Sequence, residues 1–155
     1  ARGVVAEIVV PELRDVPLYV RSNRVNGICD VAGKSNCLLV SVHANAGGGT
    51  GWEAHTCLGD SMSDRYSALF YEKAGEAFGK EWMIRKGSAD PADPDWDSNF
   101  TILRDTKCPA VLTENFFMDT ERDCRFLLSE EGRERIAAMH VEAIMACIEY
   151  HQTQS

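Results

Sequence analysis

Two ionisable residues stand at the ends of apolar runs, where a buried strand would carry them to the edge of a sheet. His43 follows the run 37–42 and precedes the glycine-rich segment 45–51, and Glu114 follows the run 110–113. An ionisable group at the tip of a buried strand is costly unless it is paired or binds a metal. Ligands collect outside the carboxyl ends of strands in α/β sheets, so we interpret the two residues as a hydrolytic His/Glu site.

Strands that alternate with amphipathic helices would position these two residues. Short apolar runs rich in β-branched residues predict the strands, which are 4–10, 37–44, 51–57, 81–85 and 110–116. Apolar residues at helical spacing predict the helices, which are 18–33, 62–78, 120–128 and 131–151. This alternation predicts one α/β domain, with a twisted, mostly parallel sheet flanked by helices.

Composition narrows the classes of partner. The 155 residues carry 16 Lys and Arg against 24 Asp and Glu, which gives a net charge of −8. A chain this acidic is not expected to bind nucleic acid, because phosphate binding needs a basic face. No apolar run approaches the ~20 residues that a membrane span requires. The six cysteines show no C-x-x-C spacing, and we expect them to be buried free thiols.

The polar segment 86–99 is broken by prolines and predicts a long loop. Its acidic spacing is reminiscent of a calcium loop. The glycine and the terminal glutamate of an EF-hand are missing, however, so the segment is better interpreted as a solvated loop.

Four motifs resemble those of one enzyme family, the zinc-dependent N-acetylmuramoyl-L-alanine amidases of the amidase-3 type. The segment 41–46 (SVHANA) resembles the family's Ser-Ile-His-Ala-Asn motif, and 16–26 resembles its Leu-x-x-Arg-x-x-x-Asn helix. The segment 51–56 resembles a Gly-Phe-Glu-Val-Tyr-Thr strand, and 102–119 matches the form Leu-Arg-x-Thr-x-x-Pro-Ala-Val-Leu-x-Glu-x-x-Phe. The four motifs occur in the family's order, and the resemblance extends over 4–148.

The resemblance implies a fold of the zinc-amidase (phosphorylase/hydrolase-like) type and a reaction. In the family, two His and one Glu hold Zn²⁺, and a separate Glu accepts a proton from the attacking water. By position, His43 matches the second His ligand and Glu114 matches the catalytic Glu. The implied substrate is peptidoglycan of the bacterial cell wall, cut between N-acetylmuramic acid and L-alanine by an autolysin or phage endolysin.

One part of the family pattern has no counterpart. The family's Gly-His-Gly loop and Glu ligand precede the strand that 4–10 matches, whereas here only Ala1–Gly3 precedes it. No Gly-His-Gly occurs near the C-terminus to supply the ligand by circular permutation. The resemblance therefore implies that 1–155 is a single amidase domain, incomplete at its N-terminus, with weak zinc binding and poor turnover.

Other polar residues have competing interpretations. Glu53 and His55 lie two apart on a predicted strand, hence on one face, and are either substitute zinc ligands or supporting and groove-lining residues. The family carries a Glu at the position of Glu53 and an aromatic residue at that of His55. Asn45 and Asn115 flank the expected site and are candidates for substrate contact. His140 falls on the apolar face of the last helix and is interpreted as a core histidine.

Two other functions fit the same residues. The domain could be a non-catalytic peptidoglycan-binding module that keeps the groove without the metal. It could also be a zinc carboxypeptidase or amidohydrolase that acts on a soluble peptide. Zinc content and product analysis would separate these from the amidase.

Overall fold

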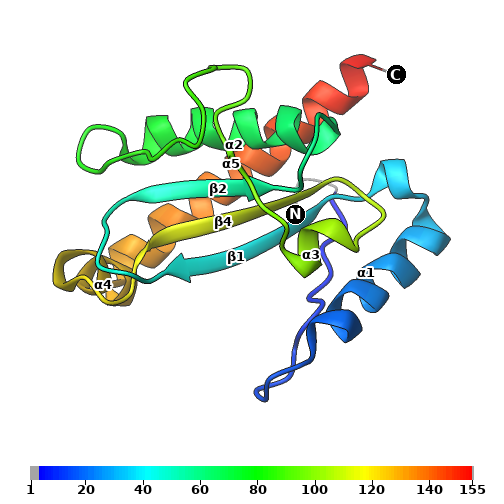
Figure 1. Cartoon of the computed structure of the whole chain (residues 1–155), viewed down its shortest axis with the longest axis horizontal. Coiled ribbons are helices and arrows are strands. Elements are labelled where there is room, and N and C mark those ends of the chain that lie inside the picture. The colour runs from blue at the N-terminus through cyan, green and yellow to red at the C-terminus, as the bar shows by residue number, and fades with distance from the viewer. Residues whose placement is uncertain (1–3, 155) are drawn as a thin grey trace.

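A four-stranded mixed sheet forms the centre of the molecule (Figure 1). The computed structural model describes residues 4–154, so the interpretation of residues 1–3 lies outside it. The strands, in spatial order, are β1 (Leu39–Asn45), β4 (Ala110–Phe117), β2 (Trp52–Thr56) and β3 (Trp96–Asp97). The β1–β4 and β2–β3 pairs are parallel and the β2–β4 pair is antiparallel. The sheet is therefore mixed, with two of its three pairs parallel.

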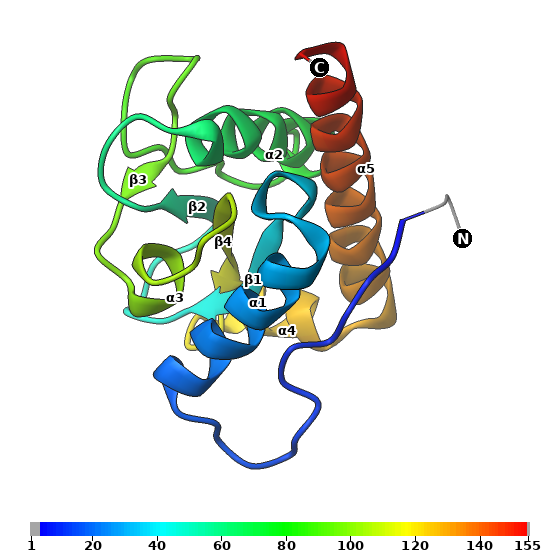
Figure 2. The same ribbon diagram turned by 90° about the vertical axis from the view of Figure 1, so that its right-hand side faces the viewer.

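Helices cover both faces of this sheet, which confirms the expected α/β architecture. They are α1 (Leu18–Ala32), a 3₁₀ turn (Lys34–Asn36), α2 (Met62–Phe78), α3 (Thr101–Arg104), α4 (Glu121–Leu128) and α5 (Glu130–Gln154). Figure 2 shows α2 and α5 side by side over one face, with α1 and α3 on the other.

Local signals set the ends of the best-defined helices. The Ser61 hydroxyl accepts a hydrogen bond from the Ser63 amide, and the Asp64 carboxylate accepts one from the Ser61 amide, so a capping box starts α2. Gly33 ends α1 with φ 85, a conformation that only glycine adopts at little cost.

Two apolar clusters lie on opposite faces of the sheet. The larger lies under α2 and α5 and includes the fully buried aromatic residues Trp52, Phe70 and Phe116. The smaller lies under α1 and α3 and includes Leu39 and Leu112 from the two parallel strands. Because alternate strand residues face opposite ways, these clusters identify the face on which each polar residue lies.

Residues 4–10 are not a strand, contrary to the sequence prediction. Val5 is 86% exposed and Ile8 81%, and the Val9 carbonyl accepts a hydrogen bond from Arg24 of α1 at 2.8 Å. β-Branched residues favour extended backbone, but a strand also needs a neighbouring strand to supply its hydrogen bonds. The segment runs beside α1 instead of beside the sheet.

Two smaller predictions also need correction. In 81–85 the pairing with the sheet is reduced to a single bridge between Ile84 and Trp52. All six cysteines are free as expected, but only three are buried, namely Cys29, Cys108 and Cys147.

Among residues 4–154, no helix is long and apolar enough to cross a membrane.

Candidate active site

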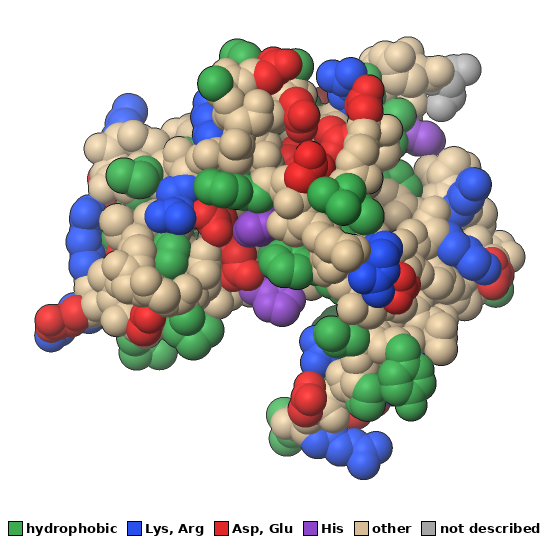
Figure 3. All heavy atoms as spheres, viewed as in Figure 1, with side chains coloured by type: hydrophobic (Ala, Val, Ile, Leu, Met, Phe, Trp, Pro, Cys, Tyr) green, Lys and Arg blue, Asp and Glu red, His purple; other side chains and the backbone are tan. Residues whose placement is uncertain are grey.

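Polar residues replace apolar ones toward the carboxyl ends of β1 and β4, on the face that α1 and α3 cover. Leu39 and Leu112 belong to the smaller core, and His43 and Glu114 follow on the same face. The register places His43 opposite Glu114, and Glu114 opposite Glu53 on β2. Three ionisable side chains thus form a row across three neighbouring strands. Figure 3 shows histidine and acidic side chains together near the centre of this face, beside a hollow.

Glu114 occupies the middle of the row and has a free carboxylate oxygen. Its Oε2 atom is buried and lacks a hydrogen-bond partner within the described residues. Burial raises the pKa of Glu114, the negative charge of Glu53 raises it further, and His55 acts in the opposite direction. A partly desolvated carboxylate with a free oxygen can accept a proton from a bound water molecule.

His43 lies beside Glu114 at the exposed edge of the row. Its Nε2 atom lies 3.0 Å from the Ser41 hydroxyl. Partial burial lowers the pKa of His43, and the positive charge of Arg21 on α1 lowers it further. The neutral imidazole that results is the form that binds metal ions.

Glu53 is buried and its carboxylate is already engaged. Oε1 accepts a hydrogen bond from Asn45 Nδ2 at 2.7 Å and lies 3.4 Å from His55 Nε2, and Oε2 accepts one from Arg85 Nε at 2.6 Å. Burial acts to raise the pKa of Glu53, but the hydrogen bonds from His55 and Arg85 together hold it below the ordinary value. These contacts favour a supporting role over metal ligation.

The substitute-ligand interpretation of Glu53 and His55 gains no support from the geometry. Between residues 4 and 154, a group of three His, Cys, Asp or Glu ligand atoms within 4.8 Å of one another occurs only at Asp64, Asp93 and Asp95. The His43 row does not form such a group.

His55 forms part of a wall at one side of the row. Its Nδ1 atom lies 2.8 Å from Ser98 Oγ, and its ring lies 5.3 Å from that of Phe100 and 6.5 Å from that of Trp96, between ring centroids. These three residues follow the long loop 86–95. The structure therefore places His55 between Glu53 and the residues that follow this loop.

The two asparagines occupy different places. Asn45 is half-buried on the face of His43, and it donates to Glu53. Asn115 is 2% exposed on the opposite face, where its Oδ1 atom accepts a hydrogen bond from Trp52 Nε1 at 3.0 Å. This position gives no support to the expectation that Asn115 contacts substrate, because strand alternation points it into the larger core. Its Nδ2 atom instead donates to the His43 carbonyl at 2.9 Å.

The sequence analysis missed Asp123, which supports the glycine-rich loop 46–51. Asp123 lies in α4 and is fully buried. It accepts hydrogen bonds from Thr50 Oγ1 at 2.6 Å, the Gly51 amide at 3.0 Å and the Phe117 amide at 3.1 Å. Two of these partners lie more than 70 residues away, so no local pattern could have revealed the role.

His140 is a buried core histidine as expected, and its side chain is hydrogen-bonded to the Thr113 hydroxyl.

A family model agrees with the motifs and with this arrangement. Residues 8–146 match the family described as N-acetylmuramoyl-L-alanine amidase (amidase-3). The chain belongs to this family. The match covers every strand of the sheet and both members of the His43–Glu114 pair.

Individual relatives are similar over most of this chain. The N-acetylmuramoyl-L-alanine amidase CwlM of Bacillus licheniformis is 31% identical over 107 residues, which are 68% of this chain and 38% of that protein. The endolysin of Bacillus phage SPP1 is 29% identical over 146 residues, 89% of this chain and 49% of that protein. The chain thus matches less than half the length of each of these relatives.

Solved amidase structures share the fold. The catalytic domain of CwlV from Bacillus (Paenibacillus) polymyxa var. colistinus superposes with a TM-score of 0.72 at 20% identity, covering 91% of this chain and 70% of that one. The catalytic domain of the CD27L endolysin, which targets Clostridia difficile, superposes with a TM-score of 0.58 at 27% identity. It covers 83% of this chain and 62% of that one.

Proposed function

We propose that this domain hydrolyses the amide bond between N-acetylmuramic acid and the L-alanine of the peptidoglycan stem peptide. The observation that carries the proposal is the free, buried Oε2 atom of Glu114 beside His43, in a chain of the amidase family. Glu114 accepts a proton as a water oxygen attacks the amide carbonyl, and then passes it to the leaving amine of L-alanine. The site of action is the bacterial cell wall.

Zinc is the proposed cofactor, and the described residues fit its site in part. The neutral imidazole of His43 is a suitable ligand and Glu114 is a suitable base, whereas the Glu53 carboxylate is held by Asn45 and Arg85. Among residues 4–154, His43 belongs to no group of three converging ligand atoms. When bound, zinc would polarise the amide carbonyl and lower the pKa of a bound water.

Replacement of Glu114 tests the base. In digests of purified cell-wall sacculi with added zinc, we expect wild type to release stem peptides with a new L-alanine amino terminus. Glu114→Gln should lower the rate by roughly 10²- to 10⁴-fold, because glutamine cannot accept the proton. Glu134→Gln, which alters an exposed residue of α5, serves as the matched control and should not change the rate. Mass spectrometry of labelled amino termini measures the products.

Each alternative gives a different result. An active Glu114→Gln variant would show that the base is misassigned. Cleavage at the carboxyl end of a soluble peptide, without new L-alanine amino termini, would favour the carboxypeptidase. Sacculus binding by a wild type that releases no product would favour the non-catalytic module.

Metal analysis tests His43 separately. We expect the 155-residue chain to bind zinc weakly, because a stable catalytic site needs three protein ligands and His43 belongs to no such group among residues 4–154. His43→Ala should abolish this binding and leave stability within about 0.5 kcal/mol, because the side chain is exposed. Elemental analysis after dialysis measures the zinc. Equal zinc in His43→Ala and wild type would assign the metal to other groups, such as the cysteines.

A further inference from the structure

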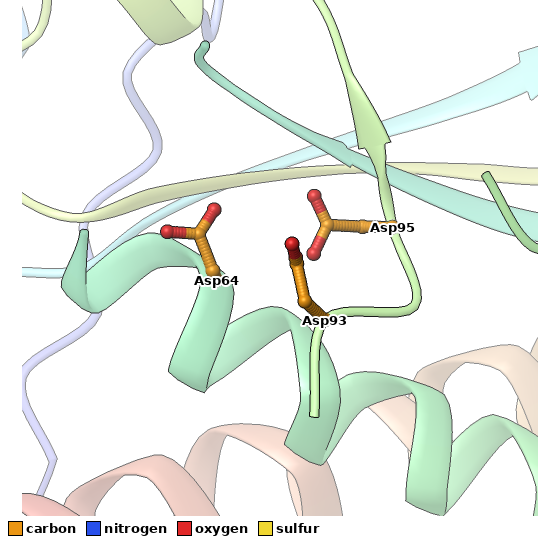
Figure 4. Close-up of side chains that lie close together, drawn as sticks. All are labelled: Asp64, Asp93 and Asp95. Carbon is orange, nitrogen blue, oxygen red and sulfur yellow. The ribbon is translucent and has the colours of Figure 1, made fainter. Parts of the chain in front are cut away.

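Three aspartates converge on the far side of β2 and β3 from the His43 row (Figure 4). Asp64 lies in the first turn of α2, Asp95 directly precedes β3, and Asp93 lies two residues earlier in the long loop. One carboxylate oxygen from each lies within 4.8 Å of the other two. Asp64 and Asp95 are buried and Asp93 is exposed. Three carboxylates at this separation repel one another unless a positive charge lies between them.

A single hydroxyl lies between two of the three carboxylates. The buried Thr56 hydroxyl lies 2.8 Å from Asp64 Oδ1 and 2.7 Å from Asp95 Oδ2. A hydroxyl has a single hydrogen, so it can donate to only one of these carboxylates. The other carboxylate faces the lone pairs of the same oxygen atom. A cation would accept this arrangement, because it binds carboxylate and hydroxyl oxygens alike.

A second, separate observation points to a missing partner. Asp95 is 6% exposed, and its Oδ1 atom has no hydrogen-bond partner in the described part of the chain. Figure 4 shows its carboxylate turned toward those of Asp64 and Asp93. None of the ion pairs formed within residues 4–154 includes any of the three. Burial raises the pKa of Asp95 to about 6, although the hydroxyls of Thr56 and Ser67 act to lower it, and the charges of the two neighbouring carboxylates add a smaller increase.

We propose that Asp64, Asp93 and Asp95 bind a calcium ion. The donors are all oxygens, which favours a hard cation over zinc. Calcium takes six to eight oxygen ligands in flexible geometry, and the three carboxylates with Thr56 supply several of them. The exposure of Asp93 leaves one side open to water molecules. The glycine of an EF-hand is unnecessary, because the ligands come from separate elements rather than one tight loop.

The ion would join the long loop to α2 and thereby brace one wall of the active site. β3 follows Asp95 directly and pairs with β2 at His55 and Thr56. The Ser98 amide, just after β3, donates to the Thr56 carbonyl at 2.9 Å, and Ser98 Oγ contacts His55. Calcium binding at Asp93 and Asp95 would therefore hold the His55 wall in place. The proposal does not depend on the amidase reaction.

Calcium titration of the full chain tests the site. After removal of metal with a chelator, we expect calorimetry to show one calcium with a Kd on the order of 10⁻⁴–10⁻³ M, the range of extracellular modules. A concentration roughly ten times Kd should raise Tm by about 3–5 °C. Asp93→Asn should weaken binding at least ~10-fold, because a ligand charge is lost. Asp90→Asn, an exposed neighbour outside the cluster, is the matched control and should retain the wild-type Kd.

Two results would overturn the proposal. One is the absence of binding heat and of any Tm shift up to about 10 mM calcium, roughly ten times the weakest expected Kd. In that case a proton shared between the carboxylates, and not a calcium ion, would relieve their repulsion. Asp95→Asn, which removes one negative charge, should then raise Tm in the absence of calcium. The other is calcium binding that Asp93→Asn and Asp95→Asn leave unchanged, which would locate the ion elsewhere. His43→Ala should retain calcium binding, which separates this site from the zinc proposal.

Discussion

Two glutamates that face each other across β2 and β4 have opposite electrostatic environments. Glu53 receives hydrogen bonds from Asn45 and Arg85, and its pKa is held low despite burial. Glu114 has a free buried oxygen, and burial raises its pKa. Where the environment moves the pKa values of two neighbouring carboxylates apart, one commonly acts as the acid or base and the other stays charged in a supporting role. This contrast supports the proposed roles, with proton transfer by Glu114 and support by Glu53.

At the scale of single residues, Arg85→Met should destabilise the fold by about 2 kcal/mol, because it removes the arginine that pairs with the buried charge of Glu53. The low pKa of Glu53 in the folded state means that the pair stabilises the fold above the pKa of an unfolded glutamate. This contribution is lost as pH falls through the lower folded-state value. Urea unfolding at neutral and acid pH should therefore show a difference between variant and wild type that shrinks in acid.

The control for this pair is Arg125→Met, which removes an exposed pair with Glu121. It should change stability by less than about 1 kcal/mol at any pH. An Arg85→Met variant as stable as wild type would mean that Glu53 finds its hydrogen bonds elsewhere.

At the scale of elements, the glycine-rich loop 46–51 is a positioned segment and not a free connection. Asp119 accepts hydrogen bonds from the Gly47 and Gly48 amides, and the buried Asp123 holds the other end. A Cβ atom on Gly49 would lie 2.5 Å from the Phe117 ring, so glycine is required there by a close approach. The loop directly follows β1, so the hydrogen bonds that hold the loop also hold the end of the strand that carries His43.

Asp123→Asn should destabilise the fold by about 2–3 kcal/mol, because a neutral amide cannot satisfy the three donors that face the carboxylate. Hydrogen exchange in 46–51 should become faster, and the rate of sacculus digestion should fall. Asp119→Asn is the comparison, with a smaller effect because Asp119 is exposed. Unchanged exchange in 46–51 after Asp123→Asn would refute the anchoring role.

At the scale of the whole molecule, the larger of the two cores lies on the α2/α5 face. The larger core contains fully buried aromatic rings, and the Phe78 and Phe116 rings pack edge to face with centroids 5.2 Å apart. The smaller core is built from aliphatic and cysteine side chains, and the polar row lies at its edge. The site therefore lies at the edge of the smaller of the two cores.

Phe70→Ala should destabilise the fold by about 3–5 kcal/mol, because it opens a cavity under α2 in the larger core. That loss is a large fraction of the about 5–15 kcal/mol typical of a domain. Leu58→Ala, at a position 62% exposed, should change stability by less than about 0.5 kcal/mol. Urea unfolding measures both, and a Phe70→Ala loss below about 1 kcal/mol would contradict the assignment of the core.

The sequence by itself determined the elements with local signals. The capping box at Ser61 and the glycine stop at Gly33 depend on groups only a few residues apart in the chain. Apolar runs that end in His43 and Glu114 located the central strands and the two main candidate residues. These signals need no knowledge of neighbouring elements, because hydrogen bonding and side-chain periodicity act within one helix or strand.

Only the tertiary structure decided which residues meet. The antiparallel pairing of β2 with β4 places Glu53 beside Glu114, and the same folding leaves 4–10 without a strand partner. Asp123 and Asp64 acquire their roles from groups on distant segments of the chain or on other elements. Burial and electrostatic pairing depend on which surfaces pack together, and this packing joins residues that local patterns cannot relate.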